Sequence, residues 1–69
     1  MTNADKAEFL VDLTRVMRQH GCTGISFWQD EGESDLSFDF GDEYIAIDPD
    51  LTAPEQLLRL STRFAKAAS

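Results

Sequence analysis

The sequence predicts one small α+β domain over residues 1–69, with the order α-β-β-β-α: a three-stranded antiparallel meander with two amphipathic helices on one face. The hydrophobic period leads to this prediction. Apolar residues recur with the helical period of 3.6 near both ends of the chain and with period 2 in the middle. Short stretches that contain glycine separate the period-2 segments, as is typical of hairpin turns.

The first helix is expected over residues 4–20. Thr2 or Asn3 can cap its start, and Asp5 suits the positive end of the helix dipole. Gly21 is expected to end the helix in the left-handed conformation. At 100° per residue, the apolar side chains fall within an arc of about 120°. They are Phe9, Leu10, Leu13, Val16 and Met17.

Three strands are expected to follow, over the stretches GISFWQD, DLSFDF and YIAID, with turns at EGES and GDE. One face would carry the apolar side chains and lie under the helices; it comprises Ile25, Phe27, Leu36, Phe38, Phe40, Ile45 and Ile47. The other face would stay wet, as one face of an antiparallel sheet commonly does. It comprises Ser26, Trp28, Asp30, Asp35, Ser37, Asp39, Tyr44, Ala46 and Asp48.

The second helix is expected over residues 53–67. Thr52 and Glu55 have the spacing of a capping box, and Pro54 fits the first turn. The apolar arc spans about 160°, whereas a surface helix needs only about 100°. The surplus predicts that this helix packs on a partner subunit as well as on the sheet. The candidates for a dimer interface are Leu57, Leu60 and Phe64.

Chain length also favours self-association. A domain this short buries only about 60% of the surface that its unfolded chain exposes, so disulfides, a metal or oligomerisation usually supplement its core. Cys22 is the single cysteine, which excludes an internal disulfide and is typical of a reducing compartment. The N-terminus lacks the pattern of a signal peptide, and no apolar run is long enough to span a membrane. We therefore expect a cytoplasmic homodimer.

The net charge of −7 is unevenly distributed. Residues 1–20 carry three acids and three bases, residues 21–50 carry nine acids and no base, and residues 51–69 carry one acid and three bases. A negative middle segment repels nucleic acid and membrane surfaces and attracts basic proteins. The expected partners are therefore basic proteins, with no direct contact to nucleic acid or membrane.

The sequence offers little for catalysis or for a cofactor. His20 and Cys22 are close in the chain, but a helix end followed by Gly21 does not aim one at the other. We expect His20 to lie on the apolar side of the helix and Cys22 to be a small, buried packing residue. The acids Asp39, Asp42, Glu43, Asp48 and Asp50 do not match a calcium loop. We expect neither an enzyme nor a metal or other cofactor.

The acidic sheet face is the strongest functional signal. Its carboxylates have an ordinary explanation, because a wet face is polar and like charges discourage aggregation. The single Trp and the single Tyr do not share that explanation, because these two residue types often dominate protein interfaces. The alternative is that a second subunit covers Trp28 and that it serves assembly. The candidate partner-binding residues are Trp28, Asp30, Asp35, Asp39, Tyr44 and Asp48.

An acidic folded face can compete for a basic surface that normally holds nucleic acid, which indicates an inhibitor or adaptor. The helix MTNADKAEFLVDLTRVMRQHG, the sheet GISFWQDEGESDLSFDFGDEYIAIDPD and the helix LTAPEQLLRLSTRFAKAAS together resemble small phage anti-quorum-sensing proteins. The resemblance implies a dimeric, non-enzymatic phage protein in the cytoplasm of the infected cell. It implies binding to a LuxR-type quorum-sensing activator, which is kept from DNA, and to the type IV pilus assembly ATPase, which blocks superinfection.

Two other resemblances give alternatives. The stretch LSFDFGDEYIAIDPD after an amphipathic helix is similar to the first half of type III secretion chaperones, which are small, acidic and dimeric. This chain is about half the length that such chaperones require, and it lacks their later strands and helix. An acidic DNA-mimicking inhibitor of a CRISPR complex is the other alternative.

Overall fold

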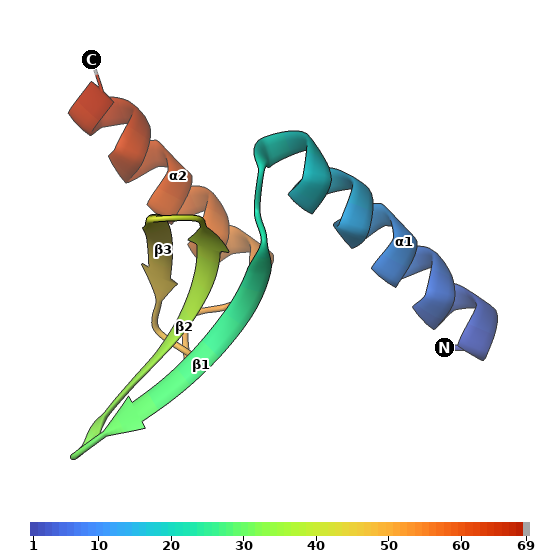
Figure 1. The fold of residues 1–69 in the computed structure, drawn as a ribbon, viewed down its shortest axis with the longest axis horizontal. Helices are drawn as coiled ribbons and strands as arrows, with labels where there is room; N and C mark the ends of the chain where they lie inside the picture. The colour runs from blue at the N-terminus through green and yellow to red at the C-terminus, as the bar shows by residue number, and fades with distance from the viewer. Residues whose placement is uncertain (69) are drawn as a thin grey trace.

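A computed structural model describes residues 1–68 and confirms the α+β class and the expected element order. The elements are α1 (Asn3–His20), β1 (Gly24–Asp30), β2 (Glu33–Phe40), β3 (Glu43–Ile47) and α2 (Pro54–Ala68). The strands form one open antiparallel sheet in the order β1-β2-β3 (Figure 1). The three segments of alternating period are thus the three strands of the meander.

Both ends of α1 are closed by the residues that the sequence indicates. Thr2 takes the cap position, and its hydroxyl accepts a hydrogen bond from the Asp5 amide at 3.1 Å. The Asp5 carboxylate accepts one from the Thr2 amide at 3.0 Å, so the two residues form a capping box. At the other end, Gly21 adopts a φ of 76°, and the Cys22 amide donates to the Met17 carbonyl at 2.8 Å. This left-handed stop ends the helix where β1 must begin.

Two-residue turns fix the register of the sheet. Gly32 and Gly41 have positive φ angles of 81° and 83°, which a glycine adopts without steric cost. Phe38 on β2 lies opposite Ile25 on one side and Ile45 on the other, and Ser37 lies opposite Ser26 and Ala46. Because side chains alternate along a strand, this register separates an apolar face from a polar one, as the period-2 pattern predicts.

The start of α2 differs from expectation. The helix begins at Pro54, and the amides of Gln56 and Leu57 donate to the carbonyl of Ala53, both at 3.0 Å. Ala53 therefore takes the cap position, and the expected capping box of Thr52 with Glu55 is wrong. Proline is favoured at the first helical position, where its missing N–H is not needed, so the cap falls on the residue directly before it.

The two helices differ in how they lie on the sheet. α2 runs along one side of the sheet beside β3, whereas α1 projects away from it (Figure 1). Within one chain, α1 therefore does not cover the apolar face as expected. The physical reason is the short link between α1 and β1: the Thr23 amide donates to the Asp39 carbonyl at 2.8 Å, which fixes the end of the helix at the end of the sheet.

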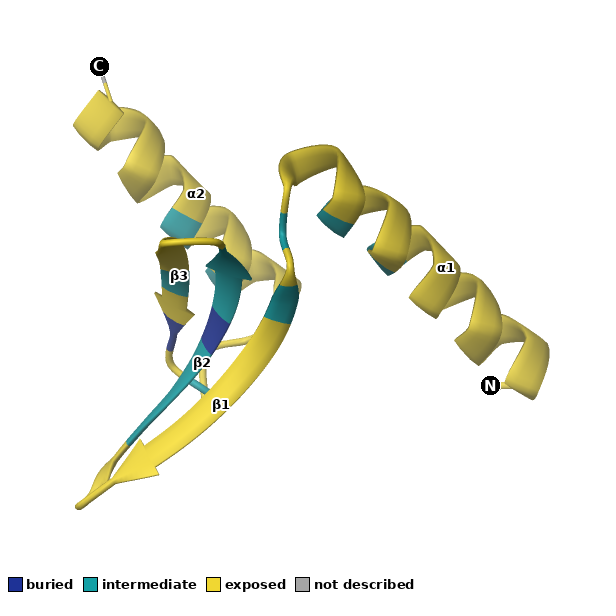
Figure 2. Cartoon of the chain, in the orientation of Figure 1, coloured by how far each residue is buried: buried dark blue, intermediate teal, exposed yellow. Residues whose placement is uncertain are grey.

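The chain consequently has almost no interior of its own (Figure 2). Ile47 and Ser37, each 6% exposed, are the only buried side chains among residues 1–68, while Phe27 on the apolar face is 59% exposed. The accessible surface is 5972 Å², whereas a compact monomer of this mass exposes about 4,300 Å². The radius of gyration is 13.9 Å, against about 11 Å for a compact domain of this length. The fold leaves a large apolar surface to be covered.

Candidate functional site

The polar face of the sheet brings most of the predicted partner-binding residues together. Trp28 on β1 lies directly opposite Asp35 on β2, and Tyr44 on β3 lies directly opposite Asp39 on β2. At about 3.3 Å per residue along a strand, Asp35 and Asp39 are about 13 Å apart on β2. The two aromatic side chains therefore lie at diagonally opposite corners of the face, each beside a carboxylate of the central strand.

Small side chains form the middle of this face. Ser26, Ser37 and Ala46 occupy one row across the three strands. The hydroxyls of Ser26 and Ser37 are 3.1 Å apart, and Ser26 donates to the Asp39 carboxylate at 2.8 Å. The side chains of Trp28 and Tyr44 are 48% and 69% exposed. The face thus has a low centre held by hydrogen bonds and two exposed aromatic side chains that stand at its corners.

Hydrogen bonds hold both the side chain and the backbone of Asp39. The hydrogen bond from Ser26 orients the Asp39 carboxylate beside Tyr44, which is the cross-strand neighbour of Asp39. The carbonyl of Asp39 is held as well, by the amide and hydroxyl of Thr23 at 2.8 and 3.3 Å. Asp39 is therefore a positioned carboxylate, which suits the recognition of a fixed cation better than a freely rotating one.

Two of the six predicted residues lie at the margin of the face. Asp30 ends β1 and accepts a hydrogen bond from the Glu31 amide at 2.9 Å, at the tip of the first hairpin. Asp48 lies past the end of β3, where its carboxylate accepts a hydrogen bond from the Asp50 amide at 2.9 Å and stabilises the following turn. The candidate site on the face therefore consists of Trp28, Asp35, Asp39 and Tyr44, with Asp30 as an extension.

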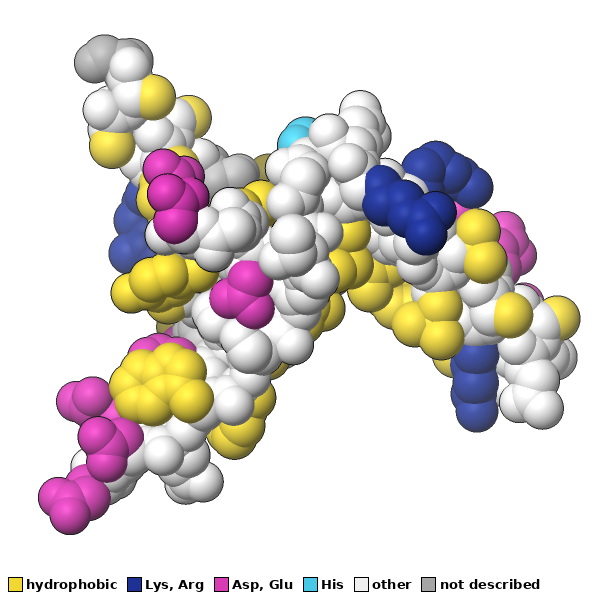
Figure 3. Space-filling model, in the orientation of Figure 1, with side chains coloured by type: hydrophobic (Ala, Val, Ile, Leu, Met, Phe, Trp, Pro, Cys, Tyr) yellow, Lys and Arg dark blue, Asp and Glu magenta, His cyan; other side chains and the backbone are white. Residues whose placement is uncertain are grey.

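The electrostatics of the molecule are divided between sheet and helices (Figure 3). All six Lys and Arg residues lie on α1 and α2, and the sheet with its turns carries acids alone. Acidic side chains gather over the strands and the hairpin tip, and Lys and Arg lie over the two helices (Figure 3). The strands and their turns carry no basic side chain of their own, so the field over the sheet attracts a cationic surface.

The sequence pattern placed Ser26 and Ser37 on the polar face but did not identify them as site residues. Only the register shows that the two serines are cross-strand neighbours in the central row. The dimer-interface candidates are divided in the structure. Leu57 and Phe64 are exposed, whereas Leu60 is half-buried in a groove beside β3.

His20 and Cys22 do not form a catalytic pair in the geometry. His20 is exposed. Cys22 is half-buried and not fully buried as expected, and its thiol donates a weak hydrogen bond to the Gly24 carbonyl at 3.4 Å. Among residues 1–68, no three His, Cys, Asp or Glu side chains come together in a group that could hold a metal ion. Neither of the two helices is long and apolar enough to cross a bilayer.

Comparison with protein-family models, with curated proteins and with solved structures found no match to this chain. The function must therefore be argued from the acidic face and the exposed apolar surfaces themselves.

Proposed function

We propose that the protein is a non-enzymatic inhibitor that binds a basic, nucleic-acid-binding surface of another protein through its acidic sheet face. The observation that carries the proposal is the pairing of each exposed aromatic residue with a carboxylate of β2, Trp28 with Asp35 and Tyr44 with Asp39. Aromatic side chains supply most of the binding energy at interfaces, and carboxylates beside them select a cationic partner.

The resemblance to phage anti-quorum-sensing proteins supplies the proposed targets. The first is the DNA-binding surface of a LuxR-type activator, and the second is the type IV pilus assembly ATPase. Both are cytoplasmic, so the proposal places this protein in the cytoplasm of an infected bacterium. A face that carries acids alone supports the first target best, because a surface that binds DNA phosphates is rich in Lys and Arg.

We also propose that the functional unit is a homodimer. The surface beyond that of a compact monomer is roughly 1,600 Å² per chain. Obligate dimers bury a total of about 2,000–5,000 Å², so a surplus of this size in each of two copies fits one such interface. The surfaces that need cover are the apolar side of α1, the uncovered apolar sheet face at Ile25 and Phe27, and the exposed Leu57 and Phe64 of α2.

Charge favours the same interface. Residues 1–20 sum to zero charge and residues 51–69 to +2, whereas residues 21–50 sum to −9. Two copies that meet through helices and the apolar sheet face keep their negative faces apart and free for targets. The charged side chains of the helices then lie at the rim, where they affect solubility more than affinity.

The test is competition for DNA. The protein is added to the purified DNA-binding domain of a LuxR-type activator bound to labelled operator DNA, and the free DNA is measured by anisotropy. We expect displacement by the wild type that weakens as salt is raised, because charge steering is screened. The double variant Asp35→Lys/Asp39→Lys should fail to displace the DNA.

The control for that variant reverses the same amount of charge elsewhere. Glu8 on α1 and Asp50 in the turn after β3 are both exposed and lie off the sheet face. Glu8→Lys/Asp50→Lys should compete nearly as well as the wild type. Equal competition by both double variants would show that the acidic face is not the binding surface, and competition lost equally in both would show that net charge alone acts.

A further inference from the structure

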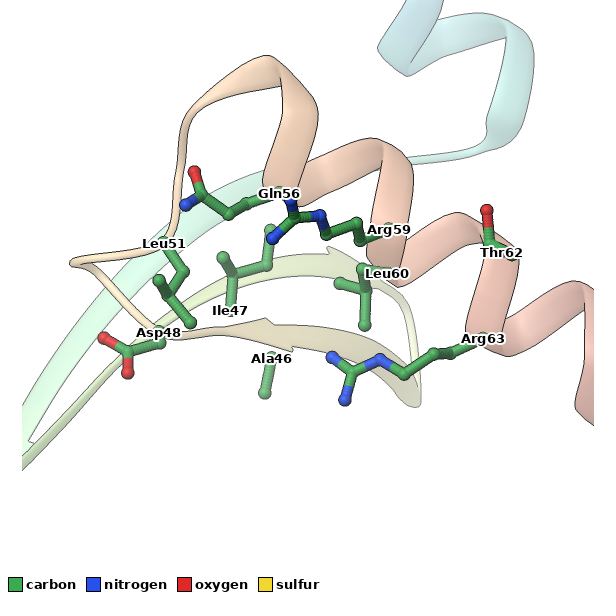
Figure 4. Close-up of a pocket in the computed structure, with 9 residues that line it drawn as sticks. All are labelled: Ala46, Ile47, Asp48, Leu51, Gln56, Arg59, Leu60, Thr62 and Arg63. Atoms are coloured by element: carbon green, nitrogen blue, oxygen red, sulfur yellow. The ribbon is translucent and has the colours of Figure 1, made fainter.

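A groove of about 530 Å³ lies between β3 and α2, and its lining includes Ala46 and Asp48 at the β3 margin of the polar face (Figure 4). Its floor is apolar and is formed by Ile47, Leu51 and Leu60. The turn after β3 brings Leu51 to this floor, because the Leu51 amide donates to the Asp48 carbonyl at 2.9 Å. Arg59 and Arg63 line the α2 side, and their guanidinium groups extend toward β3 over this floor (Figure 4).

These two arginines lie on a chain with a net charge of −7. Within residues 1–68, neither guanidinium has an ion-pair partner, although the chain has thirteen acids. Arg15 on α1, by contrast, pairs with Asp12 at 3.2 Å. A guanidinium binds a carboxylate through two parallel hydrogen bonds. Two arginines without ion-pair partners above an apolar floor therefore suit a ligand whose carboxylates are attached to aliphatic side chains.

The other wall of the groove is an open sheet edge. β3 is an outer strand, and within the described chain it pairs with β2 alone. The far side of such a strand presents free N–H and C=O groups to any extended segment that runs alongside. Binding by addition of a strand uses these groups for affinity and the neighbouring side chains for specificity.

The spacings of the two walls agree. Arg59 and Arg63 are four residues apart on a helix, a rise of about 6 Å. Residues two apart on a strand are about 6.6 Å apart and project from the same face. We propose that this groove binds an extended acidic segment of another protein, which adds to the edge of β3 and presents two carboxylates, two residues apart, to Arg59 and Arg63.

A second copy of this chain fits the groove less well than a foreign segment. On the α2 helical wheel, Leu57 lies about 100° from Gln56 and Phe64 about 100° from Arg63, so these two dimer candidates lie to one side of the groove, and of the three candidates only Leu60 lines it. A symmetric pairing of β3 with its copy would bring four arginines to one seam, which repels. Pairing β3 with β1 of a copy would not close and would continue into a filament.

The inference stands apart from the proposed function. The acidic face presents Trp28 and Tyr44 beside the carboxylates of β2, whereas this groove presents Arg59 and Arg63, and the two surfaces meet at Ala46 and Asp48. Two surfaces of opposite charge allow one small protein to hold two different partners, and either surface can be inactivated without the other.

The test uses a fluorescein-labelled nonapeptide in which two Glu residues, two positions apart, are set among Val and Thr. A matched peptide carries Gln at the same two positions. Binding is measured by fluorescence anisotropy with the full-length protein, its Arg59→Ala/Arg63→Ala variant, and a control variant, Arg15→Ala/Arg18→Ala. The control removes the same charge from α1, outside the groove. Backbone amide NMR shifts locate the peptide.

We expect saturable binding of the Glu peptide, with amide shifts along β3, and about tenfold weaker binding by the Arg59→Ala/Arg63→Ala variant, as two partly exposed ion pairs would give. The Gln peptide should bind as weakly to the wild type, and the α1 control should bind the Glu peptide normally. Absence of saturable binding, equal loss in both double variants, or shifts outside β3 and α2 would overturn the proposal. So would light scattering in which only the Arg59→Ala/Arg63→Ala variant loses the dimer, because a second copy would then occupy the groove.

Discussion

Trp28 on β1 and Asp35 on β2 occupy directly opposite positions on neighbouring strands, with both side chains on the polar face of the sheet. The same relationship recurs between Tyr44 and Asp39 at the other end of β2. An indole beside a carboxylate suits a Lys or Arg side chain of a partner. The ring can contact its aliphatic part, and the carboxylate can bind its charged group.

Truncating the aromatic residues should weaken target binding more than it weakens the fold. We expect Trp28→Ala and Tyr44→Ala each to lower affinity for the basic target by roughly tenfold to thirtyfold, about 1.4–2 kcal/mol, as aromatic residues that anchor an interface do. Titration calorimetry measures the affinity, and circular dichroism checks that the secondary structure is kept. Affinities within twofold of the wild type would assign these side chains to another role.

The single Trp also reports binding directly. Because Trp28 is the only indole in the chain and is about half exposed, its emission should shift to shorter wavelength when a target covers it. The shift should be absent in the Asp35→Lys/Asp39→Lys variant mixed with the same target. A blue shift that appears on raising the concentration of this protein alone would instead show that the second subunit covers Trp28.

A charge placed on the exposed apolar side of α2 should dissociate the dimer. Phe64 is 56% exposed in one chain, and burying a Phe side chain stabilises by about 1.5–3 kcal/mol. Phe64→Asp should therefore yield monomers, or unfolded chains, at micromolar concentration, as measured by light scattering together with circular dichroism. Thr62→Asp, on the same helix but on another side, should leave the mass unchanged. A wild type that is already monomeric and folded would contradict the proposed dimer.

The cap of α1 should make helix stability depend on acid pH. The hydrogen bonds from the backbone amide and side chain of Thr2 hold the pKa of the Asp5 carboxylate below its ordinary 3.8. A lowered folded-state pKa means that the ionised cap stabilises the helix above the unfolded value and that this contribution is lost as pH falls through the folded value. NMR titration should find the pKa of the Asp5 carboxylate below its ordinary 3.8, and Asp5→Asn should remove this dependence of stability on pH.

Gly21 should be required for its backbone conformation and not for space. Its φ of 76° is left-handed, yet a Cβ built there would meet no atom within 4 Å. Gly21→Ala should therefore lower the free energy of unfolding by about 1–2 kcal/mol. Gly24 offers the matched control, because it also has open space but no positive φ, and Gly24→Ala should be nearly neutral in urea unfolding. Equal losses of stability in Gly21→Ala and Gly24→Ala would show that the left-handed conformation of Gly21 is not the cause.

Local patterns were sufficient for the elements of this protein. Period and turn chemistry predicted the helix and strand positions, because the side-chain alternation of Ile25 and Phe27 and the left-handed preference of Gly21 act within a few residues of the chain. The same patterns predicted which residues share the polar face. The capping box of Thr52 failed because two local signals competed there and Pro54 imposed the stronger constraint.

The sequence by itself therefore determined the order of elements, the two faces of the sheet and the confinement of basic residues to the helices. Only the tertiary structure decided that α1 projects from the sheet, that Ser26 orients Asp39, and that Arg59 and Arg63 of α2 lie above the open edge of β3. Those relationships join residues far apart in the chain. They depend on the direction in which each connection leaves its element, and no local pattern of side chains records that direction.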